Sequence, residues 1–448
     1  MGGETIWPTR PLKDCAVWYS GGTPNKATPR YWGGSIPWIS AKSLNDYFVS
    51  DSEDRVTEEG ARNGTRLVPK DSILFIVRGM SLKSEFRMGI ATRPVTFNQD
   101  LKALVAVDDV VPAYLAYAIR SKTTEILQMV GEAGHGTGVL PTDRIQSLEI
   151  PVPSLEEQHA VAAIVGALDA KIELNRKMNA TLEAMARALF KSWFVDFDPV
   201  RAKAEGRAPS GMDAETAKLF PSEFVDSELG PIPKGWRATT LGTEVERCGG
   251  AVQTGPFGSQ LHASDYVPEG VPVVMPKDIG GRRVSTASIA RVPEHDALRL
   301  SRHRLQPGDV VYSRRGDVER HALIGARETG WLCGTGCLLV RLGPNWPSPM
   351  FASFALDRPE TRAWISQHAI GATMPNLNTG ILSAVPLVMP SDDVLRAFAA
   401  AVDPLQALVV IRDAETGLLA KTRDELLPRL LSGELPVDAR ERAVEEVA

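Results

Sequence analysis

Cysteine is scarce in this chain, and its few cysteines do not form a metal-binding motif. The 448 residues include four, Cys15, Cys248, Cys333 and Cys337, and no CxxC pair occurs among them. Cys333 and Cys337 also lack the neighbouring His/Cys cluster that would complete a zinc site. The sequence therefore predicts reduced thiols and no structural metal.

Long apolar runs and an excess of charge of one sign are missing as well. We find no run approaching the ~18 apolar residues of a membrane span, and the first thirty residues lack the basic-then-apolar order of a secretion signal. The chain has 50 Lys and Arg against 55 Asp and Glu, a formal net charge of −5. Any nucleic-acid surface must therefore be local. We expect a cytoplasmic protein without a membrane partner, long enough for about three domains.

Signatures of catalysis are missing or weak. The chain contains no GxxxxGK[ST] loop, no HExxH and no tetrapeptide of the kind that amino-methyltransferases use. Ser259, His262 and Asp265 are close in sequence, but catalytic triads are assembled across a fold, so this spacing is no evidence for one. Asp71 and Asp309 begin predicted strands without the Glu-x-Lys that metal-dependent cleavage needs. We expect a binding protein without an active site.

The sequence does contain a long-range repeat with an offset of about 237 residues. "LVPKDSIL" from Leu67 matches "LQPGDVVY" from Leu305, and the Arg-Gly dipeptide at Arg78 matches the one at Arg315. Further matches at the same offset pair Leu140, Leu148 and Pro153 with Leu377, Val385 and Pro390. A repeat of this length indicates a duplicated domain and not a solenoid array.

Each repeat ends in a long segment whose apolar residues are spaced four and three apart, as in a coiled coil. The first helix is predicted to open at Ser154 with an S-x-x-E capping box. Both helices are polar in the middle, at Asn175 and Asn179 in the first and at Arg412 and Thr416 in the second. Antiparallel pairing would place these residues opposite one another, whereas a shifted register would bury them against leucine at ~1–3 kcal/mol each. The alternative is that each helix packs only on its own domain.

These patterns predict an α/β (α+β) fold with two similar globular domains, separated by an antiparallel pair of long coiled-coil helices and related by a pseudo-two-fold axis. Such a helix pair would hold the domains at a fixed separation, as a split DNA site requires. Pro428 is expected to kink or end the second helix one turn early. The predicted boundaries are 1–153 and 237–390 for the domains, 154–195 and 391–432 for the helices, 196–236 for a linker and 433–448 for a tail.

The segment from Arg282 to Arg327 is basic, with ten arginines against five acidic residues. Guanidinium groups suit bidentate recognition of phosphate and of guanine edges. The corresponding loop of the first repeat, "VRGMSLKSEFR", is also basic, although a solvated surface of mixed charge is the alternative. The candidate DNA contacts are Lys42, Arg78, Lys83 and Arg87 in the first repeat and Lys277, Arg282, Arg283, Arg314, Arg315 and Arg320 in the second.

Several longer motifs resemble the specificity subunit of type I restriction-modification systems. "IPVPSLEEQHAVAAIVGALDAKIELNRKMNATLEAMARALFKSWFVDFDPV", from Ile150, is similar to the central helix of that family and its exit. "GMDAETAKLFPSEFVDSELGPIPKGW", from Gly211, resembles the linker into the second target-recognition domain. "GGTPNKATPRYW" from Gly21 and "QTGPFGSQLHASDY" from Gln253 resemble domain openings, and "ELLPRLLSGEL" from Glu425 resembles the C-terminal end.

The resemblance implies that each globular domain is a target-recognition domain that binds one half of a bipartite, asymmetric site in double-stranded DNA. It further implies two modification (methyltransferase) subunits docked on the helices, and restriction/translocase subunits in the full complex. S-adenosylmethionine, for adenine-N6 methylation, and ATP and Mg2+ would be bound by these partners, while the chain itself would hold no cofactor. The competing interpretation is a coiled-coil protein-interaction scaffold without DNA binding. Salt-dependent binding of duplex DNA separates the two.

Overall fold

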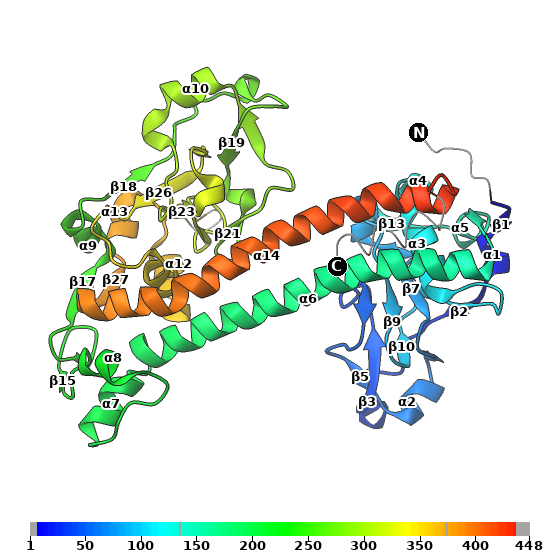
Figure 1. Cartoon of the computed structure of the whole chain (residues 1–448), viewed down its shortest axis with the longest axis horizontal. Coiled ribbons are helices and arrows are strands. Elements are labelled where there is room, and N and C mark those ends of the chain that lie inside the picture. The colour runs from blue at the N-terminus through cyan, green and yellow to red at the C-terminus, as the bar shows by residue number, and fades with distance from the viewer. Residues whose placement is uncertain (1–6, 134–135, 372–374, 436–448) are drawn as a thin grey trace. The chain divides into compact units, whose positions relative to one another are not determined.

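The computed structural model describes residues 7–133, 136–371 and 375–435 (Figure 1). The chain divides into two compact units. Unit 1 comprises residues 1–177 and 412–448, and unit 2 comprises residues 178–411. Both divisions fall inside the long helices, because each helix contributes one segment to the core of each unit. The sequence-based boundaries had assigned the helices to segments of their own.

Unit 1 has a mixed α/β fold. Its elements before the first long helix are β1 (Thr9–Pro11), α1 (Leu12–Cys15), β2 (Ala16–Ser20), β3 (Trp32–Ile39), β4 (Phe48–Val49), β5 (Arg55–Val56), α2 (Glu58–Arg62), β6 (Arg66–Val68), β7 (Ile73–Ile76), β8 (Arg78–Gly79), β9 (Met88–Ala91), β10 (Val95–Phe97), β11 (Leu101–Ala106), α3 (Pro112–Ser121), α4 (Thr123–Gln128), β12 (Gly131–Ala133), β13 (Thr137–Val139), α5 (Thr142–Gln146) and β14 (Glu149–Pro151). The larger sheet has the order β2-β11-β7-β9-β4, and a second sheet has the order β5-β3-β10-β6. Strand β7 is a continuous apolar run because the core covers both of its faces.

The globular part of unit 2 repeats this plan. Its elements are β17 (Arg237–Thr240), α9 (Leu241–Arg247), β18 (Ala251–Thr254), β19 (Val271–Val274), β20 (Ile279–Gly280), β21 (Arg283–Val284), β22 (Ala290–Val292), α10 (Glu294–Arg299), β23 (Val310–Ser313), β24 (His321–Leu323), β25 (Leu332–Cys333), β26 (Cys337–Arg341), α11 (Pro349–Leu356), α12 (Pro359–His368), α13 (Thr379–Ser383) and β27 (Pro386–Met389). The sheet β18-β26-β23-β24 has the same order as β2-β11-β7-β9 in unit 1. The antiparallel pairs β1–β14 and β17–β27 correspond as well. The sequence repeat is therefore a repeat of fold.

The segment predicted as a linker, residues 196–236, forms part of the core of unit 2. It contains α7 (Asp198–Ala204), α8 (Ala214–Lys218) and the paired strands β15 (Phe224–Val225) and β16 (Ile232–Pro233). Phe220 and Trp236 are buried, and the Trp193 ring contacts Phe220 edge-on at 5.1 Å. The aromatic residues of this segment pack against the end of the preceding helix, so the segment is ordered.

Two long helices follow the repeats, α6 (Leu155–Phe194) and α14 (Asp392–Ser432). The predicted capping box of α6 is confirmed: the Glu157 amide donates to Ser154 Oγ at 3.3 Å, and the Ser154 amide donates to Glu157 Oε2 at 3.1 Å. Of the two outcomes expected at Pro428, a kink or an early end, the early end does not occur, because α14 continues to Ser432, where the predicted helix boundary lies. Burial of Leu427, Leu430 and Leu431 in the core of unit 1 holds this last turn, despite the amide donor that proline lacks.

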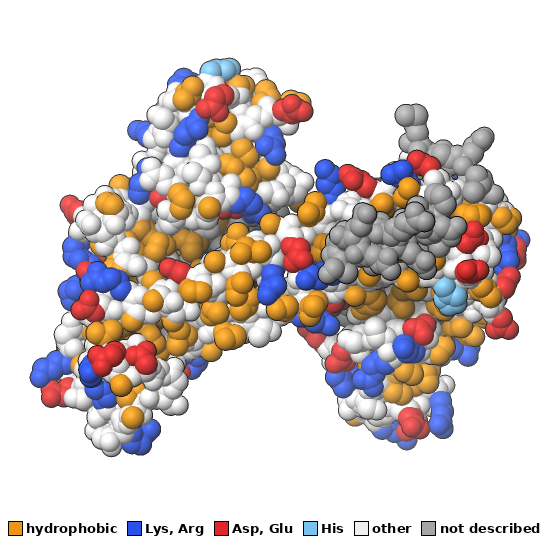
Figure 2. Space-filling view, viewed as in Figure 1, with side chains coloured by type: hydrophobic (Ala, Val, Ile, Leu, Met, Phe, Trp, Pro, Cys, Tyr) orange, Lys and Arg blue, Asp and Glu red, His pale blue; other side chains and the backbone are white. Residues whose placement is uncertain are grey.

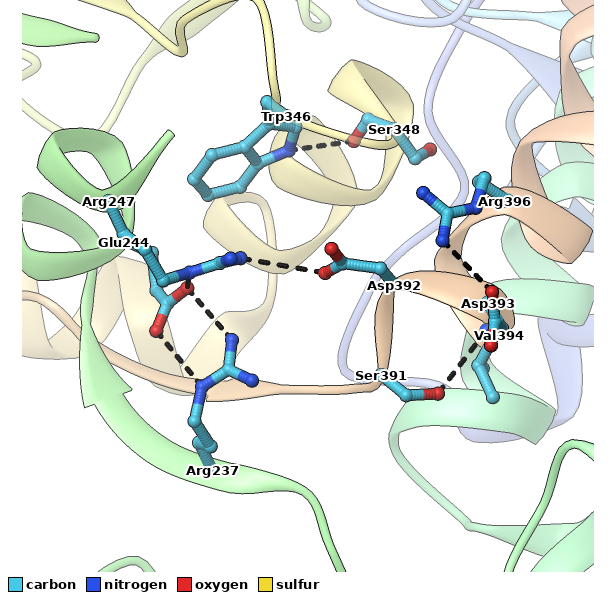
Figure 3. A network of polar contacts seen from close by, with 10 residues as sticks. All are labelled: Arg237, Glu244, Arg247, Trp346, Ser348, Ser391, Asp392, Asp393, Val394 and Arg396. Atoms are coloured by element: carbon cyan, nitrogen blue, oxygen red, sulfur yellow. Dashed lines mark hydrogen bonds and ion pairs between the residues drawn. The ribbon is translucent and has the colours of Figure 1, made fainter. Parts of the chain in front are cut away.

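The start of α14 is tied to the first helix of the second repeat (Figure 3). The Val394 amide donates to Ser391 Oγ at 3.4 Å, and Asp392 pairs with Arg247 of α9 at 3.6 Å. Arg247 also pairs at 2.7 Å with Glu244, whose carboxylate accepts a second arginine, Arg237. Burial alone would raise the pKa of the Glu244 carboxyl. The two arginines have the larger combined effect, so its pKa is lowered. The negative charge of Asp392 at this helix start therefore belongs to a charge network.

Within unit 1, the segments of α6 and α14 run in opposite directions. Asn175 Nδ2 donates to Glu415 Oε2 at 2.9 Å, and Arg423 Nη1 donates to Asp169 Oδ1 at 2.7 Å. Contacts therefore move to lower numbers on α14 as they move to higher numbers on α6.

Unit 2 continues the same order. Asn179 Nδ2 donates to the Val409 carbonyl at 3.4 Å, and the Phe190 ring lies edge-on to Phe398 at 6.2 Å. The helix segments in this unit are also antiparallel.

The two central asparagines do not have the partners expected from the heptad count. Asn175 bonds to the carboxylate of Glu415 and Asn179 to a main-chain carbonyl, whereas Arg412 and Thr416 were expected. In the described part of the chain, Arg412 Nε and Thr416 Oγ1 are buried without a hydrogen-bond partner. A heptad count places residues on the seam, but it does not decide which of two neighbours on a turn reaches across.

A buried ion-pair network holds unit 1 together. Asp169 of α6 accepts from Arg423 of α14 at 2.7 Å and from Arg120 of α3 at 3.0 Å. The Asp169 side chain is 6% exposed and that of Arg423 is 11% exposed. Burial lowers the pKa of Arg423, but its hydrogen bonds to Asp169 and Asp424 more than compensate, and the pKa is raised.

The apolar composition of α14 corrects one sequence-based expectation. One 18-residue window of this helix has a mean hydropathy of 1.7, so α14 is long and apolar enough to cross a membrane by length and composition alone. Part of this apolar surface is accounted for by packing, since Val394, Phe398 and Val402 lie in the core of unit 2. Only 28% of the window is buried, which leaves an apolar surface to be explained.

Replacing Asp169 with Ala should lower the free energy of unfolding by about 3 kcal/mol, because Arg423 would remain buried without its carboxylate. Urea unfolding followed by fluorescence measures this change. The double variant Asp169→Leu, Arg423→Met should recover most of the loss, since it leaves no unpaired charge between the helices. Lys421→Ala, which removes an exposed pair with Glu425, is the control and should change stability by less than about 0.5 kcal/mol. A loss from Asp169→Ala as small as the control would contradict this role.

Candidate nucleic-acid interface

In unit 1, Arg78 lies on a short strand that the rest of the fold holds in place. The Val77 and Arg78 amides both donate to the Asp100 carbonyl, at 2.8 and 3.2 Å. On its other side β8 pairs with β13, where Arg78 lies opposite Val139. The Arg78 side chain is exposed and has no acidic partner in the part of the chain that the structure describes.

Unit 2 holds Arg315 in the equivalent place. The Arg314 amide donates to the Gly336 carbonyl at 2.8 Å, and Arg315 forms an antiparallel bridge with Asn376. The Arg315 side chain is exposed and, among residues 7–133, 136–371 and 375–435, has no acidic partner. In both units, therefore, the loop after the central strand presents an unpaired arginine beside the segment that precedes the last short helix.

The other candidates in unit 1 are exposed or partly exposed and have partners. Lys42 lies 3.6 Å from Glu53, Lys83 lies 3.0 Å from Glu132, and Arg87 pairs with Glu85 at 2.7 Å. Exposed pairs of this kind are weak and exchange readily with solvent, so these residues stay predicted DNA contacts.

In unit 2, the basic segment is largely neutralised by its own surroundings. Eight of its ten arginines have a partner, and only Arg314 and Arg315 have none within the described ranges. The partnered residues are Arg282 (Asp357), Arg283 (Glu183), Arg291 (Gly270 carbonyl), Arg299 (Asp296), Arg302 (His303), Arg304 (Glu294), Arg320 (Asp317) and Arg327 (Glu328). The remaining candidate, Lys277, donates to the Ser288 carbonyl at 2.9 Å. Figure 2 accordingly shows basic and acidic side chains intermixed on the visible face.

Arg282 is wrong as a DNA-contact candidate, because its side chain is only 11% exposed. Its guanidinium lies 4.0 Å from the centre of the Phe354 ring and donates to Ser353 Oγ at 3.4 Å. Burial lowers its pKa to about 10. Arg282 also has a positive φ of 62°, in a tight turn between β20 and β21. It anchors this hairpin on α11, and Arg283 pairs with Glu183 of α6, so both side chains already have structural partners.

A buried histidine supports the same part of unit 2. His321 Nε2 lies 3.1 Å from the Ser353 carbonyl, and its ring stacks on Tyr312 with the ring centres 5.1 Å apart. Burial lowers the pKa of His321 to about 4, so the ring is neutral at physiological pH.

No arrangement for metal or thiol chemistry was found in the described part of the chain. It has no group of three or more His, Cys, Asp and Glu side chains that could hold a metal ion. The four cysteines are free and buried. The chemistry that the described surface offers is recognition by unpaired guanidinium groups.

Comparison with known proteins finds relatives of one kind. Residues 5–184 match the family model of the type I restriction modification DNA specificity domain. The chain is 28% identical to the specificity subunit of the MjaIX type I restriction enzyme of Methanocaldococcus jannaschii, over 96% of this chain and 94% of that protein. It is 29% identical to the HindI specificity subunit of Haemophilus influenzae, over 73% of this chain and 78% of that one. These matches support a specificity subunit of a type I restriction-modification system.

A solved structure has the same fold. The S subunit of a type I restriction-modification system from M. genitalium superimposes with a TM-score of 0.56 at 17% identity, over 95% of this chain and 96% of that chain. At this identity the similarity establishes the fold.

The stability of unit 2 should fall as the pH decreases from about 6.5 to about 4. His321 has a folded-state pKa of about 4, below the ~6.5 of an unfolded histidine, so in this range the unfolded chain takes up a proton that the folded chain does not. The expected loss from this group is about 3 kcal/mol, and it is absent above pH 6.5. Urea unfolding between pH 4 and pH 8 measures it. His321→Gln should flatten this part of the profile, whereas the exposed His159→Gln should not. Parallel profiles for wild type and His321→Gln would contradict the assignment.

Proposed function

We propose that this chain is the non-catalytic DNA-recognition subunit of a type I restriction-modification complex, and that each unit contacts one block of a bipartite site in double-stranded DNA. The observation that carries the proposal is the pair of exposed arginines, Arg78 and Arg315, which have no acidic partner among the described residues and lie at equivalent places in two similar domains. An unpaired guanidinium can bind phosphate or a base edge without first breaking an ion pair. The site is asymmetric, because the residues around the two arginines differ.

The helices α6 and α14 set the separation of the two blocks. Within each unit their segments are antiparallel, and both helices run without interruption from one unit into the other. This continuity supports a coiled-coil spacer between two domains related by a pseudo-two-fold axis. The spacer would define the number of unspecified base pairs between the blocks.

The exposed apolar surface of the helices supports protein docking. Leu174 and Leu418 in unit 1, and Met185 and Ile411 in unit 2, are each more than half exposed. Figure 2 shows apolar side chains along both helices. This surface suits the two modification subunits, one for each unit, and it accounts for the apolar window of α14 without a membrane. Restriction/translocase subunits would join the same complex.

The cofactors of the system belong to these partners. S-adenosylmethionine would be bound by the modification subunits, and ATP and Mg2+ by the restriction/translocase subunits, so this chain would hold none of them. A cytoplasmic location follows from its DNA substrate. The isolated chain should neither methylate nor cut DNA.

Arg78→Ala and Arg315→Ala should each weaken binding to one block of the site, by ~1–3 kcal/mol if the residue reads a base edge. The measurement is the affinity of the complex with its modification subunits for duplexes carrying one altered block, at low and high salt. Affinity should fall steeply with salt, because phosphate contacts release counterions. Arg62→Ala, which removes an exposed, ion-paired arginine that is not among the candidate contacts, is the matched control. Absence of salt-dependent binding by the wild-type complex would favour a protein-only scaffold.

Inserting one heptad in both helices should lengthen the unspecified spacer by about 3 base pairs, because seven helical residues add ~10 Å. The observed pairs decide where the insertions go. To keep Asn175 with Glu415, the insertions should follow Ile172 in α6 and Thr416 in α14, on the same side of that pair. Methylome sequencing of cells that carry the variant reads the spacer directly. A heptad in one helix only should destabilise the protein, and an unchanged spacer after matched insertion would show that the helices do not set the separation.

A further inference from the structure

The two unpaired arginines lie in equivalent rows of side chains that differ only in the flanking residues. In unit 2, Arg315 and Asn376 are opposite each other in an antiparallel bridge, where the Leu377 amide donates to the Arg314 carbonyl at 2.8 Å and the Gly316 amide to the Pro375 carbonyl at 3.1 Å. This pattern defines a non-hydrogen-bonded pair, whose side chains point to the same face with Cβ atoms ~4.5–5.5 Å apart. Asn376 is therefore the immediate neighbour of Arg315.

The main chain of Asn376 is held on its other side as well. It exchanges two hydrogen bonds with Ile370, at 2.9 and 3.0 Å. Ile370 is 59% exposed, so the row of Arg315, Asn376 and Ile370 faces solvent at this end. A row anchored by main-chain bonds is a rigid platform for recognition.

Unit 1 has the same row with different chemistry. Arg78 lies opposite Val139, and Val139 lies opposite Gly131. Adding the repeat offset of 237 converts Arg78 into Arg315 and Val139 into Asn376. The central arginine is thus common to both rows, whereas its neighbour is apolar in unit 1 and a carboxamide in unit 2.

The Asn376 side chain has an unfilled hydrogen-bonding requirement. In the described part of the chain, its Oδ1 is buried without a hydrogen-bond partner. A buried acceptor left unpaired costs about 1–3 kcal/mol, and such atoms in native proteins call for an explanation. Neither end of the carboxamide is held by a described hydrogen bond, so the group can turn toward a ligand that satisfies it.

A second side chain near this strand end has a similar requirement. The Arg314 amide donates to the Gly336 carbonyl at 2.8 Å, which places the turn containing Thr335 and Gly336 beside the main chain that leads into Arg315. Thr335 Oγ1 is another buried atom without a partner among the described residues. Two unpaired oxygens among the described residues therefore belong to segments whose main chains bond to residues 314–316. A phosphate offers only acceptors, whereas the edge of a base pair in the major groove offers donors and acceptors together.

We propose that Asn376 is a specificity-determining residue that reads an adenine in the block contacted by unit 2, next to the base or phosphate bound by Arg315. A carboxamide matches adenine by accepting from N6 and donating to N7. Val139 occupies the equivalent position in unit 1 and would make an apolar contact there, of the kind that fits the methyl group of thymine. This inference rests on the proposed function, and it explains why two similar domains read different blocks.

The test uses the complex of the full chain with its modification subunits and duplexes carrying the site found by methylome sequencing. Each adenine of both blocks is replaced in turn by 7-deazaadenine, which lacks the N7 acceptor. At one adenine, this replacement should weaken binding by wild type about tenfold, while Asn376→Val should show no further loss on the modified duplex. Asn376→Val should itself bind the unmodified site roughly 5- to 150-fold more weakly. Asn345→Val, at an exposed asparagine outside the row, is the matched control.

The reciprocal change tests the equivalence of the rows. Val139→Asn should alter the preferred base at one position of the first block and leave the second block unchanged. Penalties of 7-deazaadenine that stay the same in wild type and Asn376→Val would overturn the inference, as would an equal loss of affinity by Asn376→Val for every duplex. Unchanged thermal unfolding shows that the variants fold. If the wild-type complex binds no duplex at all, the proposed function itself fails, and that result is distinct from a failure of this inference.

Discussion

The Asp169 carboxylate on α6 is shared between Arg423 on α14 and Arg120 on α3, and all three side chains are largely removed from solvent. A buried charge is tolerated only when its partners are in place, so this network excludes helix registers in which Arg423 would meet an apolar residue. It also fixes α3, and with it the β-sheets of unit 1, to the helix pair. The position of the first candidate interface therefore depends on one carboxylate outside it.

In unit 2, the equivalent contact between the globular domain and α6 has the opposite arrangement of charges. The counterpart of Arg120 at the repeat offset is Asp357, which pairs with Arg187 of α6 at 3.1 Å and lies 3.6 Å from Arg282. The domain of unit 1 thus presents a cation to an anion on α6, and the domain of unit 2 presents an anion to a cation. Because like charges repel at close range, each helix segment is complementary to its own domain and not to the other. Two copies of one fold are distinguished in this way.

The same pairing of charges within unit 2 explains why the basic segment of the sequence does not form a basic surface in the folded protein. Arg282 is buried against Phe354 and Asp357, so its guanidinium is not available to a ligand, and Arg283 pairs with Glu183. The segment from Arg282 to Arg327 therefore serves mainly to assemble unit 2. Within this segment, Arg291 and Arg302 have only uncharged partners, and only Arg314 and Arg315 have no partner of any kind among the described residues. These two lie at the end of the central strand β23. The number of arginines in a sequence segment does not by itself predict a binding surface. Recognition depends on the arginines that remain without a partner after the chain has folded.

Periodicity and motif spacing were enough to predict the repeat, the α/β class, the two long helices and the Ser154 capping box, because each depends on residues close in sequence or on similarity between repeats. Three outcomes depended on tertiary packing, which local patterns do not contain. The first is the continuation of α14 through Pro428, and the second is the burial of residues 220 and 236 in a segment predicted as a linker. The third is that Asn175 bonds to Glu415 and not to Thr416. The neighbour of each unpaired arginine lies about sixty residues away along the chain. Strand register alone brings Val139 to Arg78 and Asn376 to Arg315, and register is set by the hydrogen bonds and burial of the whole domain. The sequence by itself determined the kind of protein this is. The tertiary structure decided which side chains are free to recognise DNA, because whether a side chain is paired depends on where the fold places all of its neighbours.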